Sequence, residues 1–139
     1  MNEQQNVEKI KAMYAAFARG DVASILGALT DDVEWILEGP AIIPFAGTRR
    51  GPGEVTGFFQ ALGTTQTNQK LTIDTYVAQG DVVATMGRYA ATVTATGRSF
   101  DASVAHFFTF REGKVSKFVD FGDTALMAET YQQASAAAR

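Results

Sequence analysis

The chain has 139 residues, of which 46% are hydrophobic and 19% are charged, and its formal net charge is -3. This composition predicts one globular domain over residues 1–139, and it argues against a disordered or fibrous chain. A negative chain without a run of Lys or Arg is a poor partner for nucleic acid. The sequence has no cysteine and only one histidine, so disulfides are excluded and we expect neither a metal site nor a cofactor.

The N-terminal segment is polar, and no apolar run approaches the length of a membrane span. We therefore expect no secretory signal and no insertion into a membrane. A cytoplasmic protein is the expectation that follows.

Three segments carry apolar residues at helical spacing. Residues 7–17 form the first stripe, and residues 22–29 form a shorter one that Asp21 caps. Residues 52–62 form the third stripe, with Pro52 suited to a first helical turn. These segments predict three helices in the first half of the chain.

Strand patterns dominate the second half. Residues 33–37 alternate as a short early strand, and residues 38–53 are rich in Gly and Pro, which predicts an irregular loop. Residues 71–77 and 82–96 are rich in β-branched residues, and Gly87 inside the second run is typical of a strand that bends. The order of elements predicts an α+β domain with helices on one side of a curved sheet.

Residues 96–121 read as two strands joined near Glu112 and Gly113, and a last helix is expected over residues 124–134. A two-residue turn would place Glu112 at positive φ, which a residue with a Cβ disfavours. We therefore expect a type I turn with Gly113 as a left-handed bulge residue, which pairs Phe110 with Lys114.

This register predicts where the only histidine lies. Counting back by two places His106 opposite Phe118 and Val104 opposite Asp120. His106 and Asp120 then share one face as diagonal neighbours, with their Cβ atoms about 7 Å apart. Because apolar residues surround them, we interpret the pair as the strongest indication of a functional site.

The sequence resembles the SnoaL-like polyketide-cyclase group of the ketosteroid-isomerase-like, nuclear-transport-factor-2-like superfamily. The segments that carry this likeness span nearly the whole chain: 14–21, 33–35, 47–62, 95–101 and 107–125. The resemblance implies a cone formed by a curved antiparallel sheet, about three N-terminal helices and a short C-terminal helix. Such a cone encloses an apolar pocket, and the domain commonly forms a homodimer through the outer face of the sheet.

The resemblance also implies roles for particular positions. The general base of the isomerases falls at Trp35, and their oxyanion-hole tyrosine falls near Met13, one residue before Tyr14. Their oxyanion-hole acid falls at His106. The general base of the cyclases matches Asp120, so these positions favour the cyclase-like branch.

Asp120 is the predicted base, because a carboxylate on an apolar face needs a partner or a shift toward its neutral form, and such groups are competent bases. His106 is predicted to orient Asp120, to donate to an oxyanion or to act as a second base, with Tyr14 as a possible helper. The alternatives are a structural or edge-strand carboxylate and a histidine that only fills the wall.

A second group is predicted to contact the ligand. Trp35 and Tyr14 are also ordinary core residues, and Arg88 either pairs with a pocket acid or points outward at a dimer surface. The predicted ligand-binding residues are Trp35, Phe59, Arg88, Val104, Phe108 and Phe118.

Two functional hypotheses remain open at this point. The first is a cofactor-independent isomerase, cyclase or dehydratase that acts on a small hydrophobic carbonyl compound by acid–base catalysis. The second is a protein of the same fold that binds a small ligand without chemistry, or a dimeric adaptor. Fold alone does not decide between them.

Overall fold

The computed structural model describes residues 2–132. The four helices within this range are α1 (Glu3–Ala18), α2 (Val22–Gly27), α3 (Gly51–Thr65) and α4 (Thr124–Tyr131). The six strands are β1 (Leu29–Leu37), β2 (Gly47–Arg50), β3 (Gln66–Gln79), β4 (Val82–Val93), β5 (Ser99–Arg111) and β6 (Lys114–Gly122). Residues 133 and 134, which the sequence assigned to the last helix, lie outside the described range.

Side-chain caps set the starts of three helices. Asn2 and Gln5 form a capping box at α1, where each side chain bonds to the other residue's backbone N–H. Asp21 and Asp123 accept a backbone N–H at the starts of α2 and α4. These caps satisfy N–H groups that have no partner within a helix.

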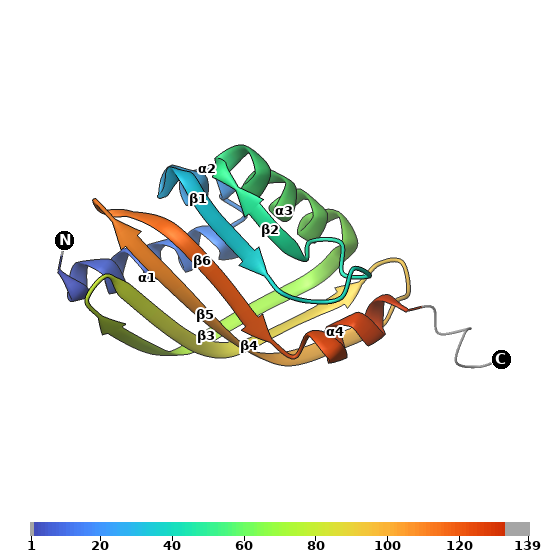
Figure 1. Ribbon diagram of the computed structural model, residues 1–139. Coiled ribbons are helices and arrows are strands. Elements are labelled where there is room, and N and C mark those ends of the chain that lie inside the picture. Colours follow the sequence, from blue (N-terminus) through green and yellow to red (C-terminus); the bar gives the residue numbers. More distant parts are fainter. Residues whose placement is uncertain (1, 133–139) are drawn as a thin grey trace.

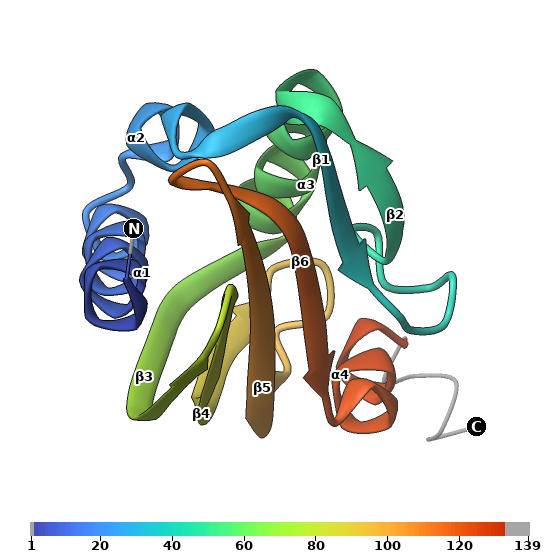
Figure 2. The same cartoon turned by 60° about the vertical axis from the view of Figure 1, so that its left-hand side comes forward.

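The six strands form one sheet in the order β2-β1-β6-β5-β4-β3 (Figure 1). Four of the five pairings are antiparallel, whereas β1 runs parallel to β6. Helix α1 packs on β3 and β4, and α3 contacts both edge strands, β2 and β3. Figure 2 shows the sheet curling from β3 round to β2 with α1, α2 and α3 at its open side. The predicted α+β fold class with a curved sheet is confirmed.

Gly87 allows the sheet to bend where β3 and β4 pair. A Cβ at this position would lie 1.9 Å from the carbonyl oxygen of Thr72. The pairing register shifts beside it, between Ile73 and Thr75. The absence of a side chain therefore permits a close approach of two backbones, as a glycine within a strand often does.

The turn between β5 and β6 differs from the prediction. Arg111 pairs with Lys114, and both central residues have positive φ, 52° at Glu112 and 79° at Gly113. The predicted type I turn, with Phe110 paired to Lys114, is wrong. Turns with two positive φ values match the right-handed twist of strands, and here that match outweighs the strain at Glu112.

A bulge follows this turn and decides which side chains meet. Phe110 pairs with Val115 and Thr109 with Lys117, so Ser116 is the extra residue. From there Asp120 lies directly opposite His106, and the predicted pairing of Asp120 with Val104 is wrong. The prediction that His106 and Asp120 share a face is nevertheless correct.

The Gly- and Pro-rich segment also contains more order than predicted. Residues 47–50 form β2, which pairs antiparallel with β1 at the edge of the sheet. A four-residue edge strand has too few alternating positions to give a sequence signal. The pairing brings Arg50 within 3.0 Å of Glu34, as an exposed ion pair.

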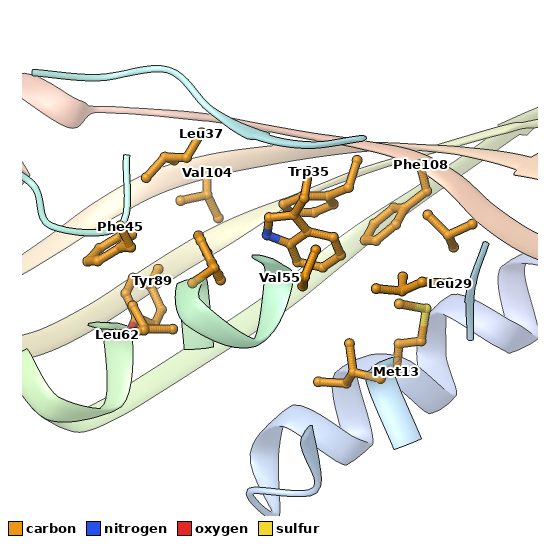
Figure 3. Packing of buried hydrophobic residues seen from close by; sticks show 14 of the residues in the cluster. Met13, Leu29, Trp35, Leu37, Phe45, Val55, Leu62, Tyr89, Val104 and Phe108 are labelled. Atoms are coloured by element: carbon orange, nitrogen blue, oxygen red, sulfur yellow. The ribbon is translucent and has the colours of Figure 1, made fainter. Parts of the chain in front are cut away.

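Buried apolar side chains from the sheet and helices pack on the concave side (Figure 3). Trp35 lies near the centre of this cluster and stacks on Phe118 with ring centroids 4.0 Å apart. Among the described residues, no helix is both long and apolar enough to cross a membrane.

Candidate functional site

The site lies on the concave face of the sheet, where three strand pairings place four residues in one row. Leu37 on β1 is opposite Asp120, Asp120 is opposite His106, and His106 is opposite Thr85 on β4. The neighbouring row contains Trp35, Phe118 and Phe108 in register. A polar row therefore runs beside an aromatic one on the same face.

A chain of polar contacts connects this row to α1. Asp120 Oδ1 lies 3.3 Å from His106 Nε2, and His106 Nδ1 lies 2.7 Å from Tyr14 Oη. Tyr14 Oη also lies 2.7 Å from Thr85 Oγ1. The side chain of His106 is 7% exposed and that of Asp120 is 18% exposed. Such enclosure strengthens the contacts, because little water competes for them.

Tyr14 reaches the sheet because it lies on the face of α1 that packs on β3 and β4. Burial is the main cause that raises the pKa of Tyr14, and the hydrogen bond to Thr85 opposes this effect only in part. Tyr14 therefore remains a neutral phenol at physiological pH. A neutral phenol can accept one hydrogen bond while it donates another.

The chain of contacts opens onto an apolar pocket of about 90 Å³. Helix α4 closes one end with Thr124 and Met127. Two tyrosines, Tyr14 and Tyr89, and the tryptophan also contribute to its wall. The largest group in the wall consists of phenylalanines: Phe17, Phe45, Phe58, Phe59, Phe108 and Phe118.

Trp35 is the pocket residue with an unused polar atom. Its side chain is buried, yet its Nε1 has no hydrogen-bond partner among residues 2–132. A buried N–H without a partner costs about 1–3 kcal/mol. In Figure 3 the nitrogen edge of the indole is turned to the side where Val104 and Phe45 are drawn.

Most residues that the sequence proposed for the site come together in this pocket. Asp120, His106 and Tyr14 line it, and so do five of the six predicted ligand-binding residues: Trp35, Phe59, Val104, Phe108 and Phe118. Their placement in the wall is established, whereas their roles stay predictions.

Arg88 is the exception. Its guanidinium is exposed on the outer face of the sheet, where Nε lies 2.8 Å from Asp101 Oδ1 and Nη1 lies 3.1 Å from Ser103 Oγ. The prediction that Arg88 contacts a ligand in the pocket is wrong. Arg88 therefore points outward and does not pair with an acid in the pocket. Side chains alternate along β4, so Tyr89 lies on the inner face and Arg88 on the outer face.

Thr85 is the polar residue that the sequence analysis missed. It is 1% exposed and lies in the middle of a β-rich run, where threonine is an ordinary strand residue. Thr85 could have been found by predicting how β4 pairs with β5, because the observed register places Thr85 opposite His106.

The described residues contain no group of three or more His, Cys, Asp or Glu side chains that would hold a metal ion. The connected polar groups at the pocket wall are instead a carboxylate, an imidazole and a phenol, from Asp120, His106 and Tyr14, with the hydroxyl of Thr85 behind Tyr14. That set can accept, hold and return a proton next to an apolar guest.

The sequence profile of the SnoaL-like domain matches residues 10–118. The chain belongs to the SnoaL-like family. The resemblance identified from sequence motifs is thereby confirmed, although no curated protein matches the sequence significantly.

Solved structures place this SnoaL-like protein among NTF2-like folds. An NTF2-like protein from Burkholderia thailandensis is 32% identical with a TM-score of 0.85, covering 95% of this chain and 99% of its own. TerC, co-crystallised with polyporic acid, is 28% identical with a TM-score of 0.83, covering 91% of this chain and 98% of its own. A protein from Jannaschia sp. CCS1, assigned to the SnoaL-like polyketide cyclases, is 16% identical with a TM-score of 0.81, covering 93% and 92%. At that identity the likeness concerns the fold.

Proposed function

We propose that this SnoaL-like protein is a cofactor-independent enzyme that moves a proton next to the carbonyl group of a small hydrophobic compound. The observation that carries the proposal is the contact between Asp120 and His106 at the wall of an apolar pocket. The reaction class is isomerisation, cyclisation or dehydration, since each can begin with the same proton transfer. The SnoaL-like domain of the chain, and the fold that it shares with a protein assigned to the SnoaL-like polyketide cyclases, support this class.

In the proposed reaction, the carboxylate of Asp120 removes a proton from the carbon beside the carbonyl. The electrons of the broken C–H bond form a double bond to the carbonyl carbon, and the carbonyl oxygen becomes an enolate. His106 Nε2 orients Asp120, and the same proton later returns to another atom of the substrate. Positioned acid–base groups of this kind contribute about 10²–10⁴-fold to a rate.

The test uses 2-tetralone, an apolar bicyclic ketone, in deuterated water. Enzyme should accelerate the exchange of the protons beside the carbonyl, measured by the loss of their NMR signals. Asp120→Asn should lower the accelerated rate by at least about 100-fold, because the amide cannot accept the proton. Asp101→Asn makes the same change on the exposed outer face and should leave the rate unchanged.

Binding is measured separately by the emission of Trp35, the only tryptophan in the chain. Polyporic acid, the compound co-crystallised with TerC, serves as a second test ligand. Asp120→Asn protein that still binds 2-tetralone but does not exchange its protons would support the catalytic role. An unchanged exchange rate in Asp120→Asn would contradict it.

A non-catalytic binding protein is the competing function. It predicts that wild-type protein binds 2-tetralone or polyporic acid and leaves both unchanged, with affinities that do not depend on Asp120. The adaptor variant of this hypothesis expects a filled cone, whereas the pocket here has a volume of about 90 Å³.

We also propose a homodimer formed through the outer face of the sheet. Several large apolar side chains are exposed there, among them Val77 at 59%, Met86 at 57%, Phe107 at 41% and Phe121 at 46%. Val77 on β3 and Phe107 on β5 both pair with Ala84 on β4. This outer-face patch is therefore continuous across these three strands. An exposed apolar patch of this kind is typical of an interface.

A further inference from the structure

Trp35 offers a hydrogen-bond donor at the pocket wall that no protein group uses. Within residues 2–132, the buried side-chain atoms without a hydrogen-bond partner are Asn6 Oδ1, Thr30 Oγ1 and Trp35 Nε1. Of these three residues, only Trp35 lines the pocket. The indole nitrogen donates and cannot accept, so the partner that it lacks is an acceptor atom. Buried polar groups in folded proteins are rarely left unpaired, and a guest with an acceptor would pair this one.

The tyrosine hydroxyls at the pocket wall are already engaged. Tyr14 Oη contacts both His106 and Thr85. Tyr89 Oη donates to the side chain of Gln66. To donate to a guest, each hydroxyl would have to give up a protein partner, which costs free energy. The indole N–H would give up none.

The rings around the indole do not replace a proper acceptor. Trp35 stacks on Phe118, and the rings of Phe58 and Phe59 lie at centroid distances of 5.7 Å. The face of an aromatic ring accepts an N–H only weakly. A carbonyl oxygen in the pocket would therefore be a better partner for Nε1 than the groups that surround it.

The indole nitrogen is turned toward the part of the sheet that holds Asp120. In the pairing of β1 with β6, Trp35 is opposite Phe118 and Leu37 is opposite Asp120. Trp35 and Asp120 are thus diagonal neighbours on one face, with Cα atoms about 8 Å apart. In Figure 3 the nitrogen edge of Trp35 is turned to the side where Leu37 is drawn, which is the side of the row that contains Asp120. A guest between the two side chains can contact both.

We propose that the indole N–H of Trp35 donates a hydrogen bond to the carbonyl oxygen of the guest, while Asp120 faces the carbon beside that carbonyl. The pocket then selects an apolar ketone over a hydrocarbon of the same shape. When the proton leaves, the oxygen of the enolate carries negative charge, and a hydrogen bond to a charged oxygen is the stronger one. Only this last step rests on the proposed function, since recognition of the ketone needs no proton transfer.

Access to Nε1 requires a small adjustment of the pocket wall. The atom is buried in the ligand-free chain, so a guest must shift at least one neighbouring side chain to reach it. Rotamer changes of this kind are common on binding.

The first measurement uses the only tryptophan of the chain, whose indole N–H gives a single NMR signal. The probes are 2-tetralone and tetralin, which is the same bicycle without the carbonyl group. The indole proton signal should lie at higher frequency in the 2-tetralone complex than in the tetralin complex, because a hydrogen bond to oxygen deshields the proton. This comparison needs no variant.

The second measurement replaces Trp35 by 3-benzothienylalanine, in which a sulfur atom takes the place of the N–H in a ring of similar shape. Affinities are measured by equilibrium dialysis. The analogue should bind 2-tetralone about threefold to tenfold more weakly than wild type, and tetralin equally well. Its rate of proton exchange on bound 2-tetralone should fall by about tenfold to 100-fold, because the enolate loses its donor.

Trp35→Phe is the second variant, and it removes the same N–H with a natural residue. Its looser packing weakens the binding of both probes, so the informative quantity is the ratio of the two affinities. That ratio should fall by about threefold to tenfold, as it does in the analogue.

Coincident indole signals in the two complexes would overturn the proposal, and so would an unchanged affinity ratio in the analogue and in Trp35→Phe. A pocket that binds neither probe would overturn it as well. Failure of the proposed function gives a different result, namely that Asp120→Asn exchanges the protons of 2-tetralone as wild type does. The preference for 2-tetralone over tetralin would persist in that case.

Discussion

Glu112 adopts a backbone conformation that costs free energy, because its φ is 52° and it carries a Cβ. A left-handed conformation costs a typical residue about 1–2 kcal/mol, and Asn tolerates it better than Glu does. Glu112→Asn should therefore raise the free energy of unfolding by roughly 0.5–1 kcal/mol. Urea unfolding followed by circular dichroism measures this change.

The matched control at this turn is Glu112→Gln, which removes the charge and keeps the strained side chain. It should be less stable than Glu112→Asn. Equal stabilities of the two variants would mean that backbone strain at Glu112 has no measurable effect. The same turn sets the start of β6, so this residue bears on the register that brings Asp120 opposite His106.

At the scale of whole elements, β3, β4, β5 and β6 present the outer-face patch on the side of the sheet away from α1. If the proposed homodimer forms there, a buried carboxylate in the patch should disrupt it. Phe107→Glu and Met86→Glu should each convert the dimer to a monomer, measured by size-exclusion chromatography with light scattering.

Ala12→Glu is the control for this prediction, because it adds the same carboxylate at an exposed position of α1. It should leave the dimer intact. A wild-type protein that is monomeric at all concentrations, or a dimer that survives both patch substitutions, would rule out this interface.

At the scale of the whole molecule, buried tyrosines should make the free energy of unfolding fall at alkaline pH. Burial raises the pKa of Tyr14 and the pKa of Tyr89 above the ordinary value of 10.0. Their neutral forms are favoured in the folded state, so this contribution to stability is complete below pH 10 and is lost as pH rises further. Each tyrosine should lower the free energy of unfolding by about 1.4 kcal/mol per pH unit in that range.

The measurement is a series of urea unfolding curves between pH 8 and pH 11. The free energy of unfolding should fall above pH 10 in wild type. It should fall less steeply in Tyr14→Phe, because Tyr89 is then the only one of these two buried tyrosines that remains. An equally steep fall in wild type and Tyr14→Phe would show that Tyr14 ionises freely in the folded protein.

The sequence by itself determined the kind and order of most elements, because helical and strand periodicity and caps such as Asp21 are local signals. It also determined the place of the turn at Gly113, although not the type of that turn. It also placed His106 and Asp120 on one face. That result is correct although the predicted turn is wrong. The turn shifts the pairing of β5 with β6 by one residue and the bulge at Ser116 shifts it by one more, so the observed register differs from the predicted one by two residues. A register error of an even number of residues leaves each side chain on its predicted face, because side chains alternate between the faces. The same error changes which two residues lie directly opposite each other.

Only the tertiary structure decided which groups complete the site. Tyr14 and His106 are 92 residues apart, and Tyr14 and Thr85 are 71 apart, so their contacts follow from how α1 packs on β3 and β4. Packing of a helix on a sheet is set by many side chains together, and no local pattern encodes it. The outward direction of Arg88 likewise follows from the phase of β4 relative to the core, which pairing with β3 and β5 establishes.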